Sequence, residues 1–158
     1  MVIYFYGTIK TEKEFINTYL KINKMAQIVY NALQTPDGTI IVSRHRHDYV
    51  THEDKNGKHY MVDGGTDYLR RSINHDQIDL SLYLTDDYTK IREVFVWGRN
   101  YDANMNRLPQ TEWVALKDLD DGHLDALCSY EPAGELRRLL FIKEKQYRNL
   151  DLQTINII

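Results

Sequence analysis

The sequence predicts an α+β fold: an antiparallel sheet rich in β-hairpins, with an N-terminal helix and two C-terminal helices. Short β-rich runs in the middle of the chain are separated by turns that contain Pro, Asn, Asp and Gly. Apolar residues recur at helical spacing near both ends. The 158 residues, of which 42% are hydrophobic and 27% charged, fit one domain spanning 1–158 with its own core.

The first 24 residues predict a strand followed by a helix. Residues 2–6 form an apolar, aromatic run typical of a short strand. Thr11 and Glu14 have the spacing of a capping box, and the apolar residues that follow continue a helix to about Asn23. The apolar run at the start is too short for a secretory signal or a membrane span, so a cytoplasmic protein without membrane association is expected.

Two hairpins are expected next. The first joins runs 26–34 and 39–46 through a turn that carries Pro36 at its second position and Gly38 at its fourth.

The second hairpin joins runs 48–53 and 58–63. Its turn has two possible forms: a type I′ turn at Asn56–Gly57, which pairs Asp54 with His59, or a type I turn with a glycine bulge, which pairs Asp54 with Lys58. After this hairpin, Gly64 and Gly65 permit a sharp reversal or a close backbone approach.

The remaining strands are predicted at 68–73, 80–85, 93–98 and 112–116. The polar segment 99–110, which contains Pro109, is expected to be a mobile loop. The C-terminal part is then expected to be helical to about residue 150, with a frayed tail over 151–158.

The first C-terminal helix is expected to be capped by Asp120, with Leu124, Leu127 and Cys128 on one face. The second is expected to have Pro132 in its first turn. The stripe of this second helix that faces the core is predicted to contain Leu136, Leu139, Leu140, Lys143 and Tyr147.

Charge and cysteine content exclude some classes of function. The net charge of −3 and the isoelectric point near 6.1 disfavour non-specific binding to nucleic acid, although a local basic patch remains open. The single cysteine, Cys128, can form neither an intrachain disulfide nor a thiolate metal cage, and its place on an apolar helix face favours core packing.

The segment 44–71 is the strongest candidate for a binding surface. If run 39–46 lies beside run 68–73, its arginines converge among tyrosines, and such a surface can hold phosphates and stack on bases. The candidate ligand-binding residues are Arg44, Arg46, His47, Tyr49, Tyr60, Tyr68, Arg70 and Arg71. The alternative is a charge-balanced sheet face without a ligand, because the same segment also carries five acidic residues.

Histidines in this segment raise a second possibility, a site for zinc or a similar divalent metal. On a strand, His45 and His47 would point to one face, and His52 or His59 would supply a third ligand. Asp48 or Asp63 would then act as the base of a small hydrolase or nuclease. Histidines paired with nearby carboxylates on the surface explain the same pattern without a metal, and no cofactor is predicted in the leading hypothesis.

The motif RHRHDYVTHEDKNGKHYMVDGG at 44–65, with DYLRR at 67–71, EVFVWG at 93–98 and WVALKDL at 113–119, resembles a family of short proteins from tailed bacteriophages and prophages. The resemblance covers about residues 26–149, leaves 1–24 outside, and makes Met25 an alternative start to Met1. The family has no assigned activity, so no residue role carries over. What the resemblance implies is an accessory role in the host cell, including counter-defence.

The leading hypothesis is therefore a non-enzymatic phage accessory protein in the host cytoplasm. It would act on a host protein or a small nucleotide through residues 44–71, as a homo-oligomer. The metal-dependent hydrolase or nuclease is the first alternative, and a structural or assembly protein is the second.

Overall fold

The computed structural model describes residues 27–155, which fall into two compact units. Residues 27–95 form the sheet unit and residues 96–155 form the helical unit. The predicted α+β class is confirmed, with antiparallel sheets and helices toward the C-terminus. The strand expected at 2–6 and the helix expected to end near Asn23 lie outside the described residues. The single domain over 1–158 stays a prediction.

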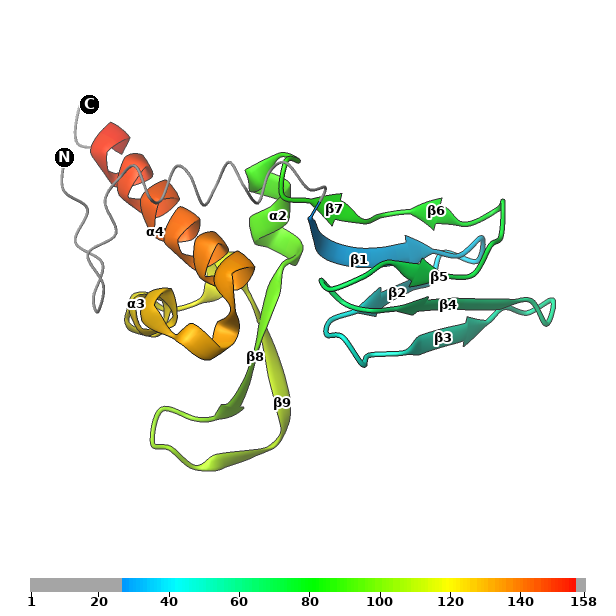
Figure 1. Cartoon of the computed structure of the whole chain (residues 1–158), viewed down its shortest axis with the longest axis horizontal. Helices are drawn as coiled ribbons and strands as arrows, with labels where there is room; N and C mark the ends of the chain where they lie inside the picture. The colour runs from blue at the N-terminus through cyan, green and yellow to red at the C-terminus, as the bar shows by residue number, and fades with distance from the viewer. Residues whose placement is uncertain (1–26, 156–158) are drawn as a thin grey trace. The chain divides into compact units, whose positions relative to one another are not determined.

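Two small antiparallel sheets make up the sheet unit (Figure 1). In the first sheet, β1 (Ile28–Gln34) pairs with β2 (Ile40–Ser43), β6 (Ile78–Asp79) and β7 (Leu82–Tyr83). In the second, β4 (His59–Asp63) lies between β3 (Val50–Glu53) and β5 (Arg70–Arg71). The helix α2 (Tyr88–Val94) ends the unit.

Side chains from both sheets meet in one core. Leu33 and Ile41 are register partners on β1 and β2, and both are buried. Tyr60 and Val62 alternate on β4, so they point to the same face as each other and pack against this pair, with Val50 at the edge. Full burial of such a side chain contributes about 1.5–3 kcal/mol to folding, and this cluster therefore holds the two sheets together.

Tyr60 gives the sheet unit a dependence on alkaline pH. Its side chain is fully buried, and its hydroxyl donates to Asp76 Oδ2 at 3.2 Å. Burial raises the pKa of Tyr60 to about 12. Because the folded state favours the neutral phenol, its contribution to stability is complete below pH about 10 and is lost as the pH rises toward 12.

We therefore expect Tyr60→Phe to move the alkaline unfolding transition to higher pH, measured by circular dichroism from about pH 8 to about pH 12. Tyr49→Phe is the matched control, since Tyr49 is 59% exposed, and it should unfold at the wild-type pH. Coincident transitions for Tyr60→Phe and the wild type would show that Tyr60 does not control alkaline unfolding.

Both predicted hairpins are confirmed. In the first, the Gly38 N–H donates to the Thr35 carbonyl at 2.9 Å, and Gly38 has a φ of 88°. In the second, the Gly57 N–H donates to the Asp54 carbonyl (2.9 Å), and the Asp54 N–H donates to the Lys58 carbonyl (3.0 Å). With Gly57 at a φ of 75°, this is the type I turn with a glycine bulge that pairs Asp54 with Lys58.

Several strand boundaries differ from the predictions. The strand expected at 80–85 is reduced to β7, and the strand expected at 48–53 begins only at Val50. β2 ends at Ser43, so Arg44 and Arg46 do not lie on a strand. The Ser43 hydroxyl bonds the Asp48 carbonyl and the Gly65 N–H, and a longer β2 would displace both groups. The strand expected at 68–73 is reduced to β5. Glu93 and Val94 belong to α2, whose first turn is capped by Asp87, and the strand expected there begins only at Val96.

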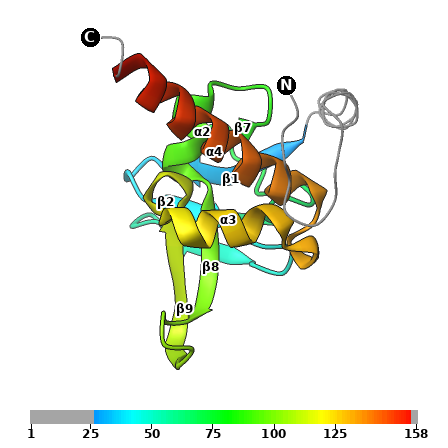
Figure 2. The same ribbon diagram turned by 90° about the vertical axis from the view of Figure 1, so that its left-hand side faces the viewer.

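In the helical unit a long hairpin is followed by two helices (Figures 1 and 2). The elements are β8 (Val96–Tyr101), β9 (Arg107–Ala115), the 3-10 turn η1 (Leu116–Asp118), α3 (Asp121–Ser129), the 3-10 turn η2 (Glu131–Ala133) and α4 (Glu135–Ile155).

The prediction of a mobile loop at 99–110 is wrong. Most of this segment belongs to the paired strands β8 and β9, and only a short turn joins them. That turn is held by Asp102, whose Oδ1 accepts the N–H groups of Asn104 (2.9 Å) and Asn106 (2.8 Å).

The two predicted C-terminal helices are confirmed, with changes in their details. Asp120 caps α3, since its Oδ1 accepts the His123 N–H at 2.8 Å. Pro132 lies in η2 instead of the first turn of α4, and α4 continues to Ile155. The buried face of α4 includes Glu144, an ionisable residue that the apolar pattern did not indicate. Within residues 27–155, no helix has the length and apolarity needed to cross a bilayer.

Candidate functional site

A buried polar network underlies the 44–71 segment. The Ser43 hydroxyl donates to the Asp48 carbonyl at 2.7 Å and accepts the Gly65 N–H at 2.9 Å. The Asp48 carboxylate accepts the Arg44 N–H at 2.7 Å, which closes residues 44–48 into a compact turn. Side-chain groups thus tie the end of β2 to the Gly64–Gly65 reversal and fix the backbone of the turn that lies between β2 and β3.

The close approach expected at Gly64 and Gly65 is confirmed. Both are buried and have positive φ, 101° for Gly64 and 54° for Gly65. A Cβ on Gly64 would lie 2.1 Å from the Tyr68 carbonyl oxygen, and a Cβ on Gly65 would lie 2.5 Å from the carbonyl carbon of His45. Only glycine fits at either position without displacing the backbone of a neighbouring segment.

Three of the candidate ligand-binding residues come together: Arg46, Tyr68 and Arg70, called here the Arg–Tyr–Arg cluster. The Tyr68 hydroxyl is 3.3 Å from the Arg46 carbonyl oxygen and 3.0 Å from Asp63 Oδ2. Arg70 Nη1 lies 3.6 Å from the same Asp63 oxygen. The hydrogen bond to Asp63 raises the pKa of Tyr68, and the guanidinium groups of Arg46 and Arg70 oppose that shift, so both cations lie within electrostatic reach of the phenol.

Two other candidates lie apart from this cluster. Tyr60 is in the core. Arg71 is half-buried and bonds to Asp79 Oδ1 and Ser81 Oγ, both at 2.7 Å, so its guanidinium has a structural role. The prediction that four arginines converge on paired strands is therefore wrong for the set Arg44, Arg46, Arg70 and Arg71. β2 ends before Arg44, and β5 pairs with β4 instead of β2.

The remaining candidates lie on the turn and the residues after it. Arg44, His47 and Tyr49 are exposed. Arg44 acts electrostatically on Tyr30 of β1, where it opposes the rise in pKa that burial causes.

The four histidines proposed as metal ligands occupy different settings. His45 and His47 lie in the turn, so the shared strand face expected for them is wrong. His52 pairs with Tyr60 across the ladder and His59 pairs with Glu53, which places the two histidines on opposite faces of the β3–β4 hairpin. His52 Nε2 lies 2.8 Å from Asp37 Oδ2, and His59 Nε2 lies 3.4 Å from Glu53 Oε2.

The acidic residues proposed as a base also have structural partners. The Asp63 carboxylate accepts the Gly64 N–H at 2.8 Å and the Tyr68 hydroxyl, and Asp48 accepts the Arg44 N–H. Among residues 27–155, no three His, Cys, Asp or Glu side chains are grouped so as to hold a metal ion.

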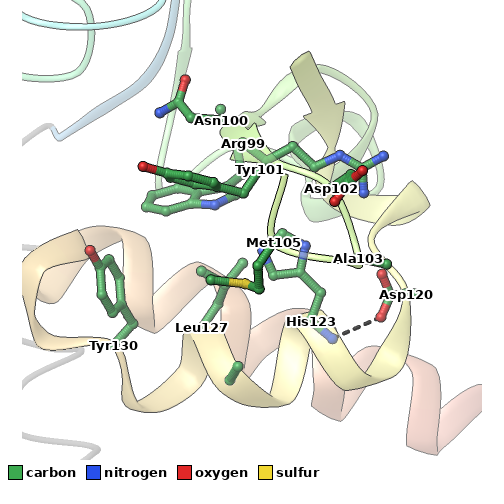
Figure 3. Close-up of a pocket in the computed structure, with 13 residues that line it drawn as sticks. Arg99, Asn100, Tyr101, Asp102, Ala103, Met105, Asp120, His123, Leu127 and Tyr130 are labelled. Atoms are coloured by element: carbon green, nitrogen blue, oxygen red, sulfur yellow. Dashed lines mark hydrogen bonds between the residues drawn. The ribbon is translucent and has the colours of Figure 1, made fainter. Parts of the chain in front are cut away.

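A pocket in the helical unit was missed by sequence reasoning. It has a volume of about 650 Å³ and lies between the β8–β9 hairpin and α3 (Figure 3). Aromatic and apolar side chains line most of it, including Trp97, Tyr101, Met105, Leu127 and Tyr130. The signal in the sequence is that Trp97, Arg99 and Tyr101 are two residues apart and so share one face of a strand, which the prediction of a loop at 99–110 leaves out.

Ring packing fixes one wall of this pocket. The Trp97 ring meets Tyr130 edge to face at 6.2 Å and Phe141 edge to face at 5.4 Å. Gly98 leaves room for the Trp113 ring on the hairpin, because a Cβ there would lie 2.9 Å from it. Tyr101 and Met105 complete the hairpin side, and Figure 3 shows Met105 between Tyr101 and α3.

Cys128 is not set up as a nucleophile. Burial raises the pKa of its thiol to about 11, so the reactive thiolate is scarce at neutral pH.

Comparison of the chain with protein-family models, curated proteins and solved structures gave no match. Function is therefore inferred from the residues and their geometry.

Proposed function

We propose that the chain is a binding protein and that the Arg–Tyr–Arg cluster holds the phosphate of a nucleotide-type ligand. The carrying observation is that two exposed arginines meet at one phenol: the Tyr68 hydroxyl contacts the Arg46 backbone carbonyl, and Arg70 contacts the same Asp63 oxygen as that hydroxyl. The Arg70 side chain is 67% exposed, so its guanidinium is accessible to a ligand. Arginine favours phosphate because its planar donors match two oxygens at once.

The backbone beneath the cluster supports this proposal. Ser43, Asp48 and the two glycines hold the turn in one conformation, so a ligand would meet a backbone that is already ordered. Pre-ordering strengthens binding because less conformational entropy is lost on association. Tyr49 and Tyr68 are exposed at 59% and 40%, which offers rings on which a base can stack.

Asp63 sets a limit on affinity. It partly neutralises Arg70 at 3.6 Å, and a phosphate must compete with this carboxylate for the guanidinium. Because the cluster is exposed, dissolved ions screen its attraction for phosphate, and binding is expected to weaken steeply as the salt concentration rises.

The resemblance of this segment to bacteriophage proteins supports an accessory role in an infected cell. A protein that sequesters a signalling nucleotide would fit a counter-defence role of this kind.

We expect Arg46→Ala/Arg70→Ala to weaken nucleotide binding by about 100-fold or more, because each charged hydrogen bond contributes about 1.5–3 kcal/mol. Isothermal titration calorimetry with linear and cyclic nucleotides, and with inorganic phosphate, would measure it. Lys55→Ala/Arg107→Ala is the control, since it removes two exposed cations outside the cluster. Equal affinities in the two double variants would reject the cluster as the site, and a wild-type protein that binds none of these probes would reject the ligand class.

A further inference from the structure

The pocket in the helical unit has a mixed lining that points to a particular ligand. Its volume of about 650 Å³ lies in the usual range for small-molecule sites. Trp97, Tyr101 and Tyr130 supply aromatic walls, and Leu127 supplies part of the base. Figure 3 shows Asp102 and Asp120 toward the opposite end from Tyr130. The site is therefore aromatic at one end and polar at the other.

The polar end is negative. Arg99 is the arginine of the pocket lining. Its Nε donates to Glu112 Oε2 at 2.7 Å, and this carboxylate offsets the charge of Arg99. Asp102 and Asp120 are bonded to no cation among the described residues; Arg99 acts on both through space, and with Glu112 counted the four groups still leave an excess of negative charge. Hydrogen bonds from Asn106 hold the pKa of Asp102 below its usual range, so this group is ionised at neutral pH.

The rim of the pocket is apolar and exposed. Met105 is 76% exposed, Tyr101 is 51% exposed and Tyr130 is 48% exposed. Met105 also has a backbone φ of 63°, a conformation that residues other than glycine seldom adopt. Neither packing nor backbone preference favours methionine at this tip, whereas contact with a partner would bury it.

We propose that this pocket binds a lysine or arginine side chain of a partner polypeptide. The apolar stem would lie between the aromatic rings, where a cation also gains from the ring faces. The charged head would reach the carboxylates of Asp102 and Asp120. The exposed apolar rim would contact the polypeptide on either side of that residue. An acidic ligand would meet two like charges, and a purely apolar ligand would leave the polar end unmatched.

The test is a titration of the whole chain with three short peptides, followed by two-dimensional NMR. The peptides are acetyl-Gly-Arg-Gly-amide and its counterparts with norleucine and with glutamate at the centre. We expect the arginine peptide to shift the indole N–H of Trp97 and the amide of His123. The indole of Trp113, which lies outside the pocket lining, should stay in place.

Asparagine substitutions separate charge from structure. Asp102→Asn/Asp120→Asn keeps one side-chain oxygen at each position to accept the backbone turn and cap hydrogen bonds, and it loses only the bond from Asn106 Nδ2 to Asp102 Oδ2. It should weaken binding of the arginine peptide by about tenfold or more and leave the norleucine peptide unchanged. Asp67→Asn/Asp118→Asn removes two exposed carboxylates outside the pocket and should have no effect.

Three results would overturn the proposal. The first is that the norleucine peptide binds as well as the arginine peptide, which would make the site purely apolar. The second is that Asp102→Asn/Asp120→Asn binds the arginine peptide as the wild type does. The third is that no peptide shifts Trp97. None of these bears on the Arg–Tyr–Arg cluster, which lies in the sheet unit.

Discussion

Gly64→Ala is expected to lower the free energy of unfolding of the sheet unit by about 3 kcal/mol or more. Two effects add. The φ of 101° is unfavourable for any residue with a side chain. The new Cβ would also lie 2.1 Å from the Tyr68 carbonyl oxygen and 2.5 Å from its ring. Relief requires Tyr68 to move, and that would break the contacts of its hydroxyl with Asp63 and Arg46.

Gly38→Ala is the matched control for this substitution. Gly38 has a similar φ of 88°, but a Cβ there would meet nothing within 4 Å. Its cost is expected to be only that of the backbone conformation, about 1 kcal/mol. Urea unfolding followed by circular dichroism compares the two. If both variants lose the same stability, the close approach at Gly64 adds nothing beyond its φ.

The second large effect is expected at Arg148. Its Nε donates to Glu144 Oε1 at 2.9 Å, and its terminal nitrogens donate to the carbonyls of Leu116 (3.1 Å), Lys117 (3.1 Å) and Leu119 (2.8 Å). One guanidinium therefore anchors α4 to the η1 segment while it neutralises a carboxylate that is 0% exposed.

Arg148→Met keeps an unbranched apolar stem and removes every one of these donors. We expect the helical unit to lose about 3–5 kcal/mol, because a buried carboxylate loses the guanidinium that neutralises it and the η1 carbonyls lose their donors. The measurement is again equilibrium unfolding, with Arg107→Met as control, because Arg107 is exposed on β9 and its loss should cost less than about 0.5 kcal/mol.

The double variant Glu144→Gln/Arg148→Met sharpens this test. Removing the buried carboxylate together with the guanidinium should restore part of the lost stability. An Arg148→Met protein as stable as the wild type, or a double variant less stable than Arg148→Met, would contradict the role of this ion pair.

Local turn chemistry explains which parts of the fold could be predicted from the sequence. Pro36 with Gly38, and Asn56 with Gly57, specify their turns within four residues, and both hairpins were predicted. The end of β2 depends on a hydrogen bond between Ser43 and Gly65, which are 22 residues apart, so no local pattern could reveal it. The β8–β9 hairpin has no such local signal, because its turn contains no glycine and depends on the Asp102 side chain instead.

The candidate site was predicted only in outline. Gly64 and Gly65 predicted the close backbone approach that the structure has, yet composition could not separate outward-facing residues from structural ones. Arg70 and Arg71 are neighbours in sequence, but strand alternation exposes the first and directs the second to Asp79 and Ser81. The pocket at Trp97 is lined by residues from β8, the turn after it and α3. These segments are separate in the sequence and come together only in the fold, so no local pattern could predict the pocket.

The fixed backbone of the 44–48 turn has a consequence for evolution. Its conformation depends on Ser43, Asp48, Gly64 and Gly65, and the contact that Arg46 makes there with Tyr68 uses its backbone carbonyl. Side chains at positions 46 and 47 can therefore diverge between lineages while the scaffold is inherited unchanged. Single substitutions at these two positions are therefore expected to change the exposed surface without passing through unstable intermediates.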